Sequence, residues 1–351
     1  MLTQKQVEEI REHLDKAQNP LFFFDNDNDG LISFLLLQRF IERGKGVVVK
    51  GGKGLGENYF RKINELNPDY VFILDVPMVE KEFLKKVNEK GLPVVWIDHH
   101  NVDCEKFNES LEGYPSLNYY NPFQNDKTNE PVSYLSYKIT GNKKDLWLAL
   151  IGCISDYYMP DFYDKFQEKY QELGIKNPKN PFDILYNSEI GKIAQILDFS
   201  LKDTTTNVVS MMKFMMKVQE PIDILQENSK TKQILQRYEE LNTHYQKLLE
   251  KARKQTDGKL IYFQYGGDLS LSYNLSNRLK YDFPGKFIVV VYINNDIANI
   301  SIRGDNARDV TLEAIKDIEG ASGGGHEKAT GARMNSDNLP KFKENVEKLI
   351  L

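Results

Sequence analysis

The chain has 351 residues, of which 40% are hydrophobic and 28% charged, and its formal net charge is −5 at pH 7. These values exclude a disordered chain and allow two domains, each with its own core. The negative charge argues against a protein that coats nucleic acid non-specifically, although it is compatible with a local basic groove.

Cysteine usage and hydropathy indicate a cytoplasmic protein. Cys104 and Cys153 form no CxxC motif, which argues against a zinc ribbon or a disulfide scaffold and fits a reducing compartment. The first 18 residues are typical of a charged amphipathic helix and lack the apolar centre of a signal peptide. Because no apolar run reaches the roughly 18 residues of a membrane span, we expect no membrane partner.

From residue 21 to 98, short apolar strands alternate with helices. Strands are expected at 21–24, 46–50, 70–75 and 92–98, and helices at 31–41 and 79–91. This alternation predicts right-handed crossovers and a parallel sheet. The carboxyl ends of parallel strands share one edge of the sheet. Asp25, Asp75 and Asp98, which stand at strand ends, should therefore converge there.

Two stretches of this region are interpreted as loops. Residues 50–60 are rich in glycine but lack the GxxxxGK[ST] order of a P-loop, so a mobile turn is the simpler interpretation. Residues 101–129 are rich in proline, asparagine and glycine, which predicts a long surface loop. Helices should resume at 131–140 and 145–158.

The rest of the chain changes character twice. Residues 161–255 show no strand pattern and predict a helical insert, whose methionines at 211, 212, 215 and 216 suit core packing. From 259 onward we expect strands at 260–265, 286–294 and 297–304, a hairpin turn at Asn294–Asn295, and helices at 269–282, 309–318 and 339–350, with helix-like sequence at 327–333. The predicted fold is therefore α/β. It has a parallel-sheet domain at 1–160, a helical connector at 161–255, and a smaller mixed α/β domain at 256–351.

Three aspartates, Asp25, Asp27 and Asp29, alternate in the turn between the first strand and its helix. Like charges this close are costly unless cations or hydrogen bonds compensate them, and the simpler alternative is a solvated acidic turn. The turn matches the start of an EF-hand loop. However, the twelfth position holds Leu36 instead of glutamate, and a strand precedes the turn, so a calcium loop is excluded.

Further candidate ligands stand at the ends of other elements. Asp98-His99-His100 follows an apolar strand and contains two of the five histidines of the chain. Carboxylates with imidazole suit Mn²⁺ or Mg²⁺ better than zinc. Six ligands suit two ions about 3.5–4 Å apart, an arrangement used for phosphoryl chemistry. The candidate metal ligands are Asp25, Asp27, Asp29, Asp75, His99 and Asp156.

Four short stretches, FDNDNDG, ILD, IDHH and GCISD, resemble in this order the four motifs of the DHH phosphoesterase superfamily. SIRG and SGGGH resemble its DHH-associated C-terminal domain, and the resemblance covers about 21–156 and 257–335. Many relatives carry histidine where this chain has Asp25, so the first motif is closer to the RecJ form than to the pyrophosphatase form. The resemblance implies a catalytic DHH domain at 1–160 and a substrate-binding domain at 256–351.

The resemblance also implies a role for each site residue. Two divalent cations are expected, with Mn²⁺ favoured over Mg²⁺. Asp75 would bridge the two ions, Asp98 would orient an imidazole, and His100 would face the scissile phosphate. One ion would be held by Asp25 and Asp27, and the other by Asp29, His99 and Asp156. The substrate would be bound by Arg303, Gly323, Gly324, Gly325 and His326, with Lys328, Arg308 and Arg333 as weaker candidates.

The expected function is hydrolysis of single-stranded DNA or RNA, or of short oligonucleotides, to nucleoside 5′-monophosphates. One alternative is a phosphodiesterase for cyclic or linear dinucleotides, and another is a non-catalytic RecJ-like replication scaffold. The sequence does not decide between DNA and RNA or give the direction of digestion. It also leaves open whether 161–255 forms a homodimer contact, a protein-partner site or a wall of the substrate channel.

Overall fold

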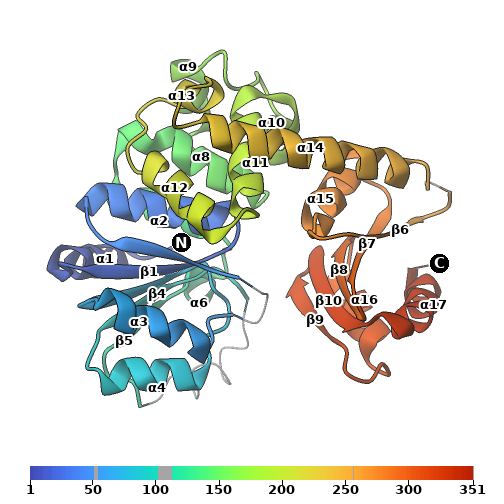
Figure 1. Cartoon of the computed structure of the whole chain (residues 1–351), viewed down its shortest axis with the longest axis horizontal. Helices are drawn as coiled ribbons and strands as arrows, with labels where there is room; N and C mark the ends of the chain where they lie inside the picture. Colours follow the sequence, from blue (N-terminus) through green and yellow to red (C-terminus); the bar gives the residue numbers. More distant parts are fainter. Residues whose placement is uncertain (51–53, 102–112, 256, 351) are drawn as a thin grey trace. The chain divides into compact units, whose positions relative to one another are not determined.

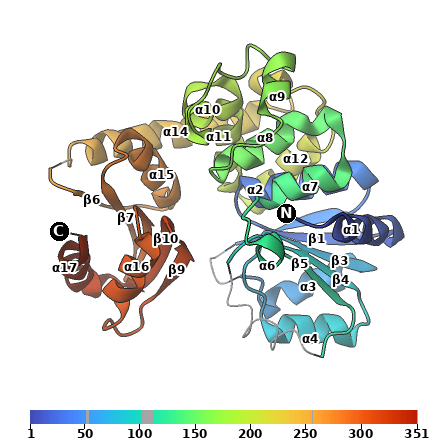
Figure 2. The same cartoon turned by 180° about the vertical axis from the view of Figure 1, so that it is seen from behind.

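A parallel five-stranded sheet organises the first of two units in the computed structural model; this unit spans Met1–Tyr238, and the second spans Glu239–Leu351 (Figures 1 and 2). The structure describes residues 1–50, 54–101, 113–255 and 257–350. Cys104, residues 51–53 of the glycine-rich loop and the first residue of the predicted 256–351 domain lie outside this description.

The strand order of the first sheet is β2-β1-β3-β4-β5, and all neighbours are parallel. The chain moves to one side of β1 to form β2 and to the other side to form β3. The order therefore reverses beside β1, where α/β sheets bind ligands. The strands are β1 (Pro20–Asp25), β2 (Lys45–Val49), β3 (Tyr70–Leu74), β4 (Val94–Ile97) and β5 (Leu117–Tyr120).

The strand β5 corrects the prediction of an uninterrupted loop over 101–129. It has only four residues, LNYY, and pairs with β4 at one edge of the sheet. Three of its four residues are only partly buried. An edge strand this short carries too few apolar residues to produce a recognisable strand pattern.

The first strand is apolar from Pro20 to Phe24, as expected where both faces of a sheet are covered. Phe22 and Phe24 pack against Phe34 of α2 (Asn28–Ile41), with ring centroids 5.5 and 5.1 Å apart. On the opposite face, Phe23 meets Phe83 of α4 (Lys81–Glu89) edge to face at 5.5 Å. Figure 1 shows α2 on one side of the sheet and α3 (Phe60–Leu66) with α4 on the other.

The helix α2 is buried along nearly its whole length because α7 and α8 cover its side away from the sheet. The α8 segment LWLALIGCI is likewise buried. The other elements before residue 160 are α1 (Gln4–Lys16), η1 (Glu57–Tyr59), α6 (Pro122–Asp126), α7 (Val132–Thr140), η2 (Lys143–Asp145) and α8 (Leu146–Ser155).

The middle of the chain is helical, as predicted, and 161–255 contains no strand in the structure. Met211, Met212 and Met215 are buried, as their predicted packing role requires. The helices are α9 (Tyr163–Lys169), α10 (Pro181–Asn187), α11 (Glu189–Leu201), α12 (Thr205–Met215), α13 (Ile222–Leu225) and α14 (Lys232–Arg253). No helix among the described residues is both long and apolar enough to cross a membrane.

The second unit contains a mixed sheet of order β6-β7-β8-β10-β9, in which only β6 and β7 are parallel. Figure 1 shows α15 on one face of this sheet and α16 with α17 on the other. The elements are β6 (Leu260–Gly266), α15 (Ser272–Asp282), β7 (Phe287–Asn294), β8 (Ile297–Arg303), α16 (Ala307–Ile315), β9 (Ser322–His326), β10 (Ala329–Asn335), η3 (Ser336–Asn338) and α17 (Leu339–Ile350).

Two predictions for this unit have different outcomes. The hairpin between β7 and β8 is confirmed, and Asn295 in its turn has a φ of 51°. The helix-like prediction for 327–333 is wrong, because this stretch leads into β10. Thr330, Ala332 and Met334 are buried while the residues between them are exposed, which is a strand period. The sequence did not indicate this strand because its small residues have low strand propensity.

Candidate metal centre

The carboxyl ends of β1, β3 and β4 bring three aspartates to one edge of the first sheet, as the predicted parallel sheet requires. Phe24 pairs with Leu74, and Leu74 with Ile97, so Asp25, Asp75 and Asp98 follow in neighbouring strands. The backbone N–H of Asp75 donates to Ile97 O at 3.0 Å, and Asp75 has a φ of 59°. This backbone conformation is uncommon outside glycine and is found at functional sites.

The turn between β1 and α2 is held by Asp27 and Gly30. Asp27 caps α2, and its Oδ1 accepts a hydrogen bond from Gly30 N at 3.0 Å. A Cβ atom added to Gly30 would lie 2.6 Å from Asp25 O and 2.7 Å from Asp25 N. Only glycine therefore allows the start of α2 to approach the end of β1 this closely.

Asp29 is buried against the beginning of α7. Its carboxylate accepts hydrogen bonds from Val132 N and Ser133 N, both at 2.8 Å, and from the Ser133 hydroxyl. The N-terminus of a helix favours negative charge, so α7 both orients and stabilises the Asp29 carboxylate. Gly152 of α8 makes this possible, because a Cβ there would lie 2.3 Å from the Ser133 hydroxyl oxygen.

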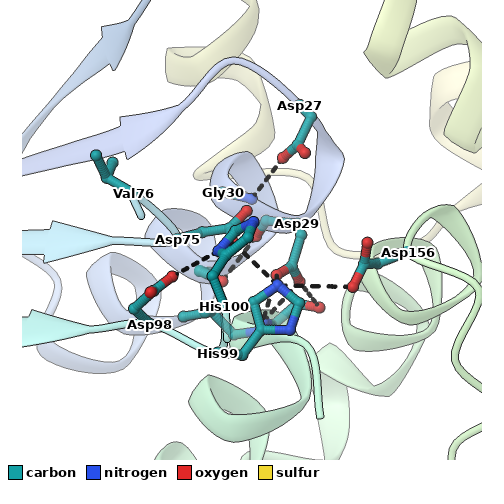
Figure 3. Close-up of polar contacts among 12 residues, drawn as sticks. Asp27, Asp29, Gly30, Asp75, Val76, Asp98, His99, His100 and Asp156 are labelled. Atoms are coloured by element: carbon teal, nitrogen blue, oxygen red, sulfur yellow. Dashed lines mark hydrogen bonds and ion pairs between the residues drawn. The ribbon is translucent and has the colours of Figure 1, made fainter. Parts of the chain in front are cut away.

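Three aspartates surround the imidazole of His99 (Figure 3). The distance from His99 Nε2 is 3.3 Å to Asp75 Oδ1, 3.7 Å to Asp156 Oδ2 and 4.0 Å to Asp29 Oδ2. Ligand atoms of Asp29, His99 and Asp156 all lie within 4.8 Å of one another. These are the three residues that the family resemblance assigns to one ion, and the structure brings them together beside Asp75.

Asp25 and Asp27 lie near this group without joining it tightly. Among the described residues, the clusters of three closely spaced candidate ligands include neither of them. Burial and, less strongly, neighbouring carboxylates raise the pKa of Asp25 to about 6 and that of Asp27 to about 7. Burial, together with the same acidic neighbours, raises the pKa of Asp75 well above its usual value.

The cluster fits divalent cations by its donors and by its unsatisfied charge. Asp75 Oδ1 is buried and has no hydrogen-bond partner among the described residues. Burial and the neighbouring His100 lower the pKa of His99, which favours the neutral imidazole that binds metals. Carboxylate oxygens with one imidazole form a donor set suited to Mn²⁺ or Mg²⁺, and a cation would relieve the repulsion among the aspartates.

Asp98 forms an ion pair with His100. Its Oδ1 lies 2.8 Å from His100 Nδ1, and the Asp98 side chain is fully buried. Burial opposes the charged imidazole, but the Asp98 carboxylate outweighs burial and raises the pKa of His100 to about 9. Burial likewise opposes the Asp98 carboxylate, but the same contact with His100 lowers the pKa of Asp98. The two residues therefore form a buried ion pair beside Asp75.

Comparisons with solved structures identify the overall fold. RecJ from Thermus thermophilus with Mn²⁺ has a TM-score of 0.65 at 15% identity, over 98% of this chain and 54% of that chain. An exonuclease RecJ bound to manganese has a TM-score of 0.63 at 14% identity, over 99% and 94% of the two chains. The DHH domain of PF0399, a member of the s1p family of ribosomal proteins, has a TM-score of 0.66 at 15% identity, over 99% and 90%. These likenesses show the fold, and this chain spans about half the length of the Thermus RecJ.

The family model of the DHHA1 domain matches residues 256–351. The C-terminal part of this chain is therefore a DHHA1 domain. Comparison with curated protein sequences found no match.

In the DHHA1 domain, Arg303 is a firmly positioned residue at the end of β8. It is buried, and its guanidinium donates to Asn277 Oδ1 at 2.5 Å and to the Ile302 carbonyl at 2.8 Å. The guanidinium carbon also lies 5.3 Å from the centre of the Tyr273 ring. Asn277 and Tyr273 are supporting residues that the sequence did not indicate.

The glycines predicted to bind substrate form the edge strand β9 of the DHHA1 domain, which pairs with β10. Gly325 has a φ of 137°, and a Cβ there would lie 2.7 Å from Ala329 O, so this position requires glycine. His326 ends the same strand. These candidate substrate-binding residues therefore lie on the edge strand of the second sheet.

Sequence reasoning missed contacts that support the candidate metal centre. Asn28 is buried, and its Nδ2 donates to Ser155 Oγ at 2.9 Å and to Ala194 O at 2.8 Å. These bonds join the start of α2 to the residue before Asp156 and to α11. A helix of the middle segment thus supports the site. Asn28 stands inside the first motif, but nothing in the sequence links it to Ala194.

Proposed function

We propose that this DHH protein is a two-metal phosphodiesterase that hydrolyses single-stranded nucleic acid or short oligonucleotides to nucleoside 5′-monophosphates. The main support is the position of His99 Nε2 within 4.0 Å of carboxylate oxygens from three aspartates on three different elements. Such a costly concentration of buried acids is expected where cations are bound.

The residues divide into two ligand sets around Asp75. Asp29, His99 and Asp156 would hold one ion, Asp25 and Asp27 the other, and the Asp75 carboxylate would face both. When bound, the ions supply a nucleophile at neutral pH and stabilise the charge that develops on the phosphoryl oxygens. The hydrogen bonds from α7 to Asp29 fix one ligand before any ion arrives, which reduces the reorganisation needed on binding.

The pair Asp98–His100 would supply the acid of the reaction. Because its pKa is about 9, His100 is protonated at neutral pH. Asp98 holds Nδ1, so Nε2 would be the ring atom that meets substrate. There it would donate to a phosphoryl oxygen or protonate the leaving group.

The substrate class is inferred from the fold and the second domain. One structural neighbour with this fold is an exonuclease, and the DHHA1 domain offers a planar guanidinium at Arg303 and a glycine edge strand ending in His326. A guanidinium can bind phosphate oxygens through two parallel hydrogen bonds. Backbone N–H groups beside glycines can approach phosphate closely.

One experiment tests the proposal. The protein would be incubated with Mn²⁺ and 5′- or 3′-labelled DNA and RNA, from dinucleotides to 30-mers, beside cyclic dinucleotides and pyrophosphate. We expect single-stranded substrates to be shortened to nucleoside 5′-monophosphates, with the ladder giving direction and preferred length. Cleavage of cyclic dinucleotides alone would replace the substrate class, and failure to cleave any phosphodiester would reject the function.

A further inference from the structure

The residue that follows Asp156 has an uncommon backbone conformation. At the end of α8, Asp156 N donates to Gly152 O at 3.2 Å and Tyr158 N donates to Cys153 O at 2.8 Å. This pattern of bonds is a helix cap in which the intervening residue is left-handed and is most often glycine. Here the position is occupied by Tyr157, with a φ of 56°.

The backbone conformation of Tyr157 is unfavourable and gains little from burial. A left-handed backbone strains any residue with a Cβ atom, and a bulky one is a clear outlier. The side chain is 57% exposed, so the hydrophobic effect offsets little of this strain. Strained backbone conformations of this kind cluster at active sites and ligand-binding positions, so we infer a functional role for this residue.

The ring of Tyr157 is nevertheless held in place. It meets the ring of Phe182 on α10 edge to face, with centroids 4.6 Å apart and an interplanar angle of 68°. Phe182 is itself buried and packs on Tyr186 at 5.4 Å. The helix cap fixes the backbone and Phe182 contacts the ring, so a largely exposed aromatic side chain is held in one orientation.

The ring belongs to the residue that directly follows a candidate metal ligand. Asp156 Oδ2 lies 3.7 Å from His99 Nε2 in the candidate metal centre, and Tyr157 is the next residue along the chain. A phosphodiester at the metal centre carries nucleosides on both sides, so a base would lie within one sugar of the reacting phosphorus. Exposed aromatic rings stack on bases of every kind because each base has a flat π surface.

We propose that Tyr157 is a stacking platform for the nucleobase next to the scissile phosphate. This rests on the proposed function, and it identifies the ligand as a nucleotide that carries a base and not as pyrophosphate or polyphosphate. It also predicts little base preference at that position, since stacking is sequence-tolerant.

The test compares dinucleotides with and without a base. Wild type, Tyr157→Gly and Tyr157→Phe would be assayed with Mn²⁺ on pApA and on two analogues in which a tetrahydrofuran replaces one or the other base. For Tyr157→Gly we expect kcat/KM for pApA, relative to one abasic analogue, to fall about 5- to 150-fold, mainly through KM. Tyr157→Phe should restore the ratio, because phenylalanine keeps the ring.

Two further readouts separate stacking from packing. Glycine suits a left-handed cap, so Tyr157→Gly should unfold at the same temperature as wild type or higher, and its Mn²⁺ affinity should be unchanged. The matched control is Phe40→Ala, because Phe40 is an aromatic residue that is also exposed, at 38%. It lies 11 residues after Asp29 on α2, about 16 Å along the helix.

The outcomes distinguish the two proposals. Equal losses on pApA and on both abasic analogues, or no loss on any, would overturn the platform while leaving the phosphodiesterase standing. A lower unfolding temperature with equal losses would assign Tyr157 to packing and overturn the platform as well. A wild-type protein inactive on all three compounds and on longer strands would overturn the proposed function, and the platform with it.

Discussion

His99 Nε2 lies 3.3 Å from Asp75 Oδ1, and this contact joins the ends of two neighbouring parallel strands. Both side chains are almost completely buried, at 1% and 2% exposure. Asp75 Oδ1 has no hydrogen-bond partner among the described residues, although it faces an imidazole. The two side chains are therefore arranged as two ligands of one cation would be.

We expect Asp75→Asn and His99→Ala each to lose Mn²⁺ binding and phosphodiesterase activity. Loss of a residue that hydrogen-bonds to a metal ligand costs about 10- to 100-fold in metal affinity or activity, so loss of a ligand itself should cost more than about 100-fold. Isothermal titration with Mn²⁺ and a labelled-oligonucleotide assay would measure the two effects. Asp164→Asn is the matched control, because Asp164 is an exposed carboxylate on α9. Full activity in either ligand variant would contradict the metal centre.

The pair Asp98–His100 should be visible as a titration in the metal-free protein. The pKa of His100 in the folded chain, about 9, exceeds the usual 6.5, so the stabilisation from this pair is complete below about pH 6.5 and is lost as pH rises through about 9. NMR titration of the imidazole should give that midpoint. In Asp98→Asn the carboxylate is removed while burial remains, so the midpoint should fall below 9. An unchanged midpoint would contradict the ion pair.

Removal of metal should destabilise the protein more at high pH than at low pH. The folded-state pKa values of Asp25 and Asp27, about 6 and about 7, lie above the usual 3.8. The unfolded chain releases these protons near pH 3.8, and the folded, metal-free chain releases them only near pH 6 to 7. Folding stability therefore falls as pH rises across this window, and the loss is complete above it. Mn²⁺ at 100 times its Kd should add about 2.7 kcal/mol and oppose this repulsion.

Calorimetric unfolding with EDTA or Mn²⁺, at pH 5.5 and pH 8, would measure this linkage. The gain in unfolding temperature from Mn²⁺ should be larger at pH 8, and Asp27→Asn should reduce the difference between the two pH values. A gain that is the same at both pH values would show that the ionisation of these aspartates is not linked to metal binding.

The convergence of the strand-end aspartates was predictable because it depends on where the strands end. Asp25, Asp75 and Asp98 each follow an apolar strand, and parallel pairing in register brings them to one edge without any further information. The hydrogen bonds that support the site from other elements were not predictable. The Asn28 side chain donates to Ala194 O, which lies 166 residues away in the sequence. The Ser133 hydroxyl donates to Asp29 because α7 begins beside that carboxylate.

The errors in the predicted fold have a common physical origin. The strand β5 has only four residues, and β9 and β10 are rich in small side chains, so pairing with a neighbour, and not an apolar period, determines their conformation. The left-handed backbone of Tyr157 could not be predicted either, because bulky residues such as tyrosine rarely adopt it. Such local conflicts between residue and backbone are expected where function imposes them.

Gly152→Ala tests whether the packing of α7 against α8 positions Asp29. Alanine favours helix formation over glycine by about 1 kcal/mol. However, its Cβ would lie 2.3 Å from Ser133 Oγ and 2.4 Å from Ser133 Cβ. We expect a net loss of about 1–3 kcal/mol in unfolding free energy, because the two helices must separate. As Ser133 moves, Asp29 loses its hydrogen bonds, so Mn²⁺ affinity should fall by about 10- to 100-fold.

Two variants isolate the cause of these losses. Gly285→Ala adds the same methyl group where nothing lies within 4 Å, so it should change stability by less than about 0.5 kcal/mol and leave Mn²⁺ binding intact. Gly152→Ala combined with Ser133→Gly removes the clash but also removes the hydroxyl that Asp29 accepts from. This double variant should therefore regain stability without regaining full Mn²⁺ affinity. If stability and affinity recover together, the hydroxyl contributes nothing to the ligand, and α7 acts on Asp29 through its backbone alone.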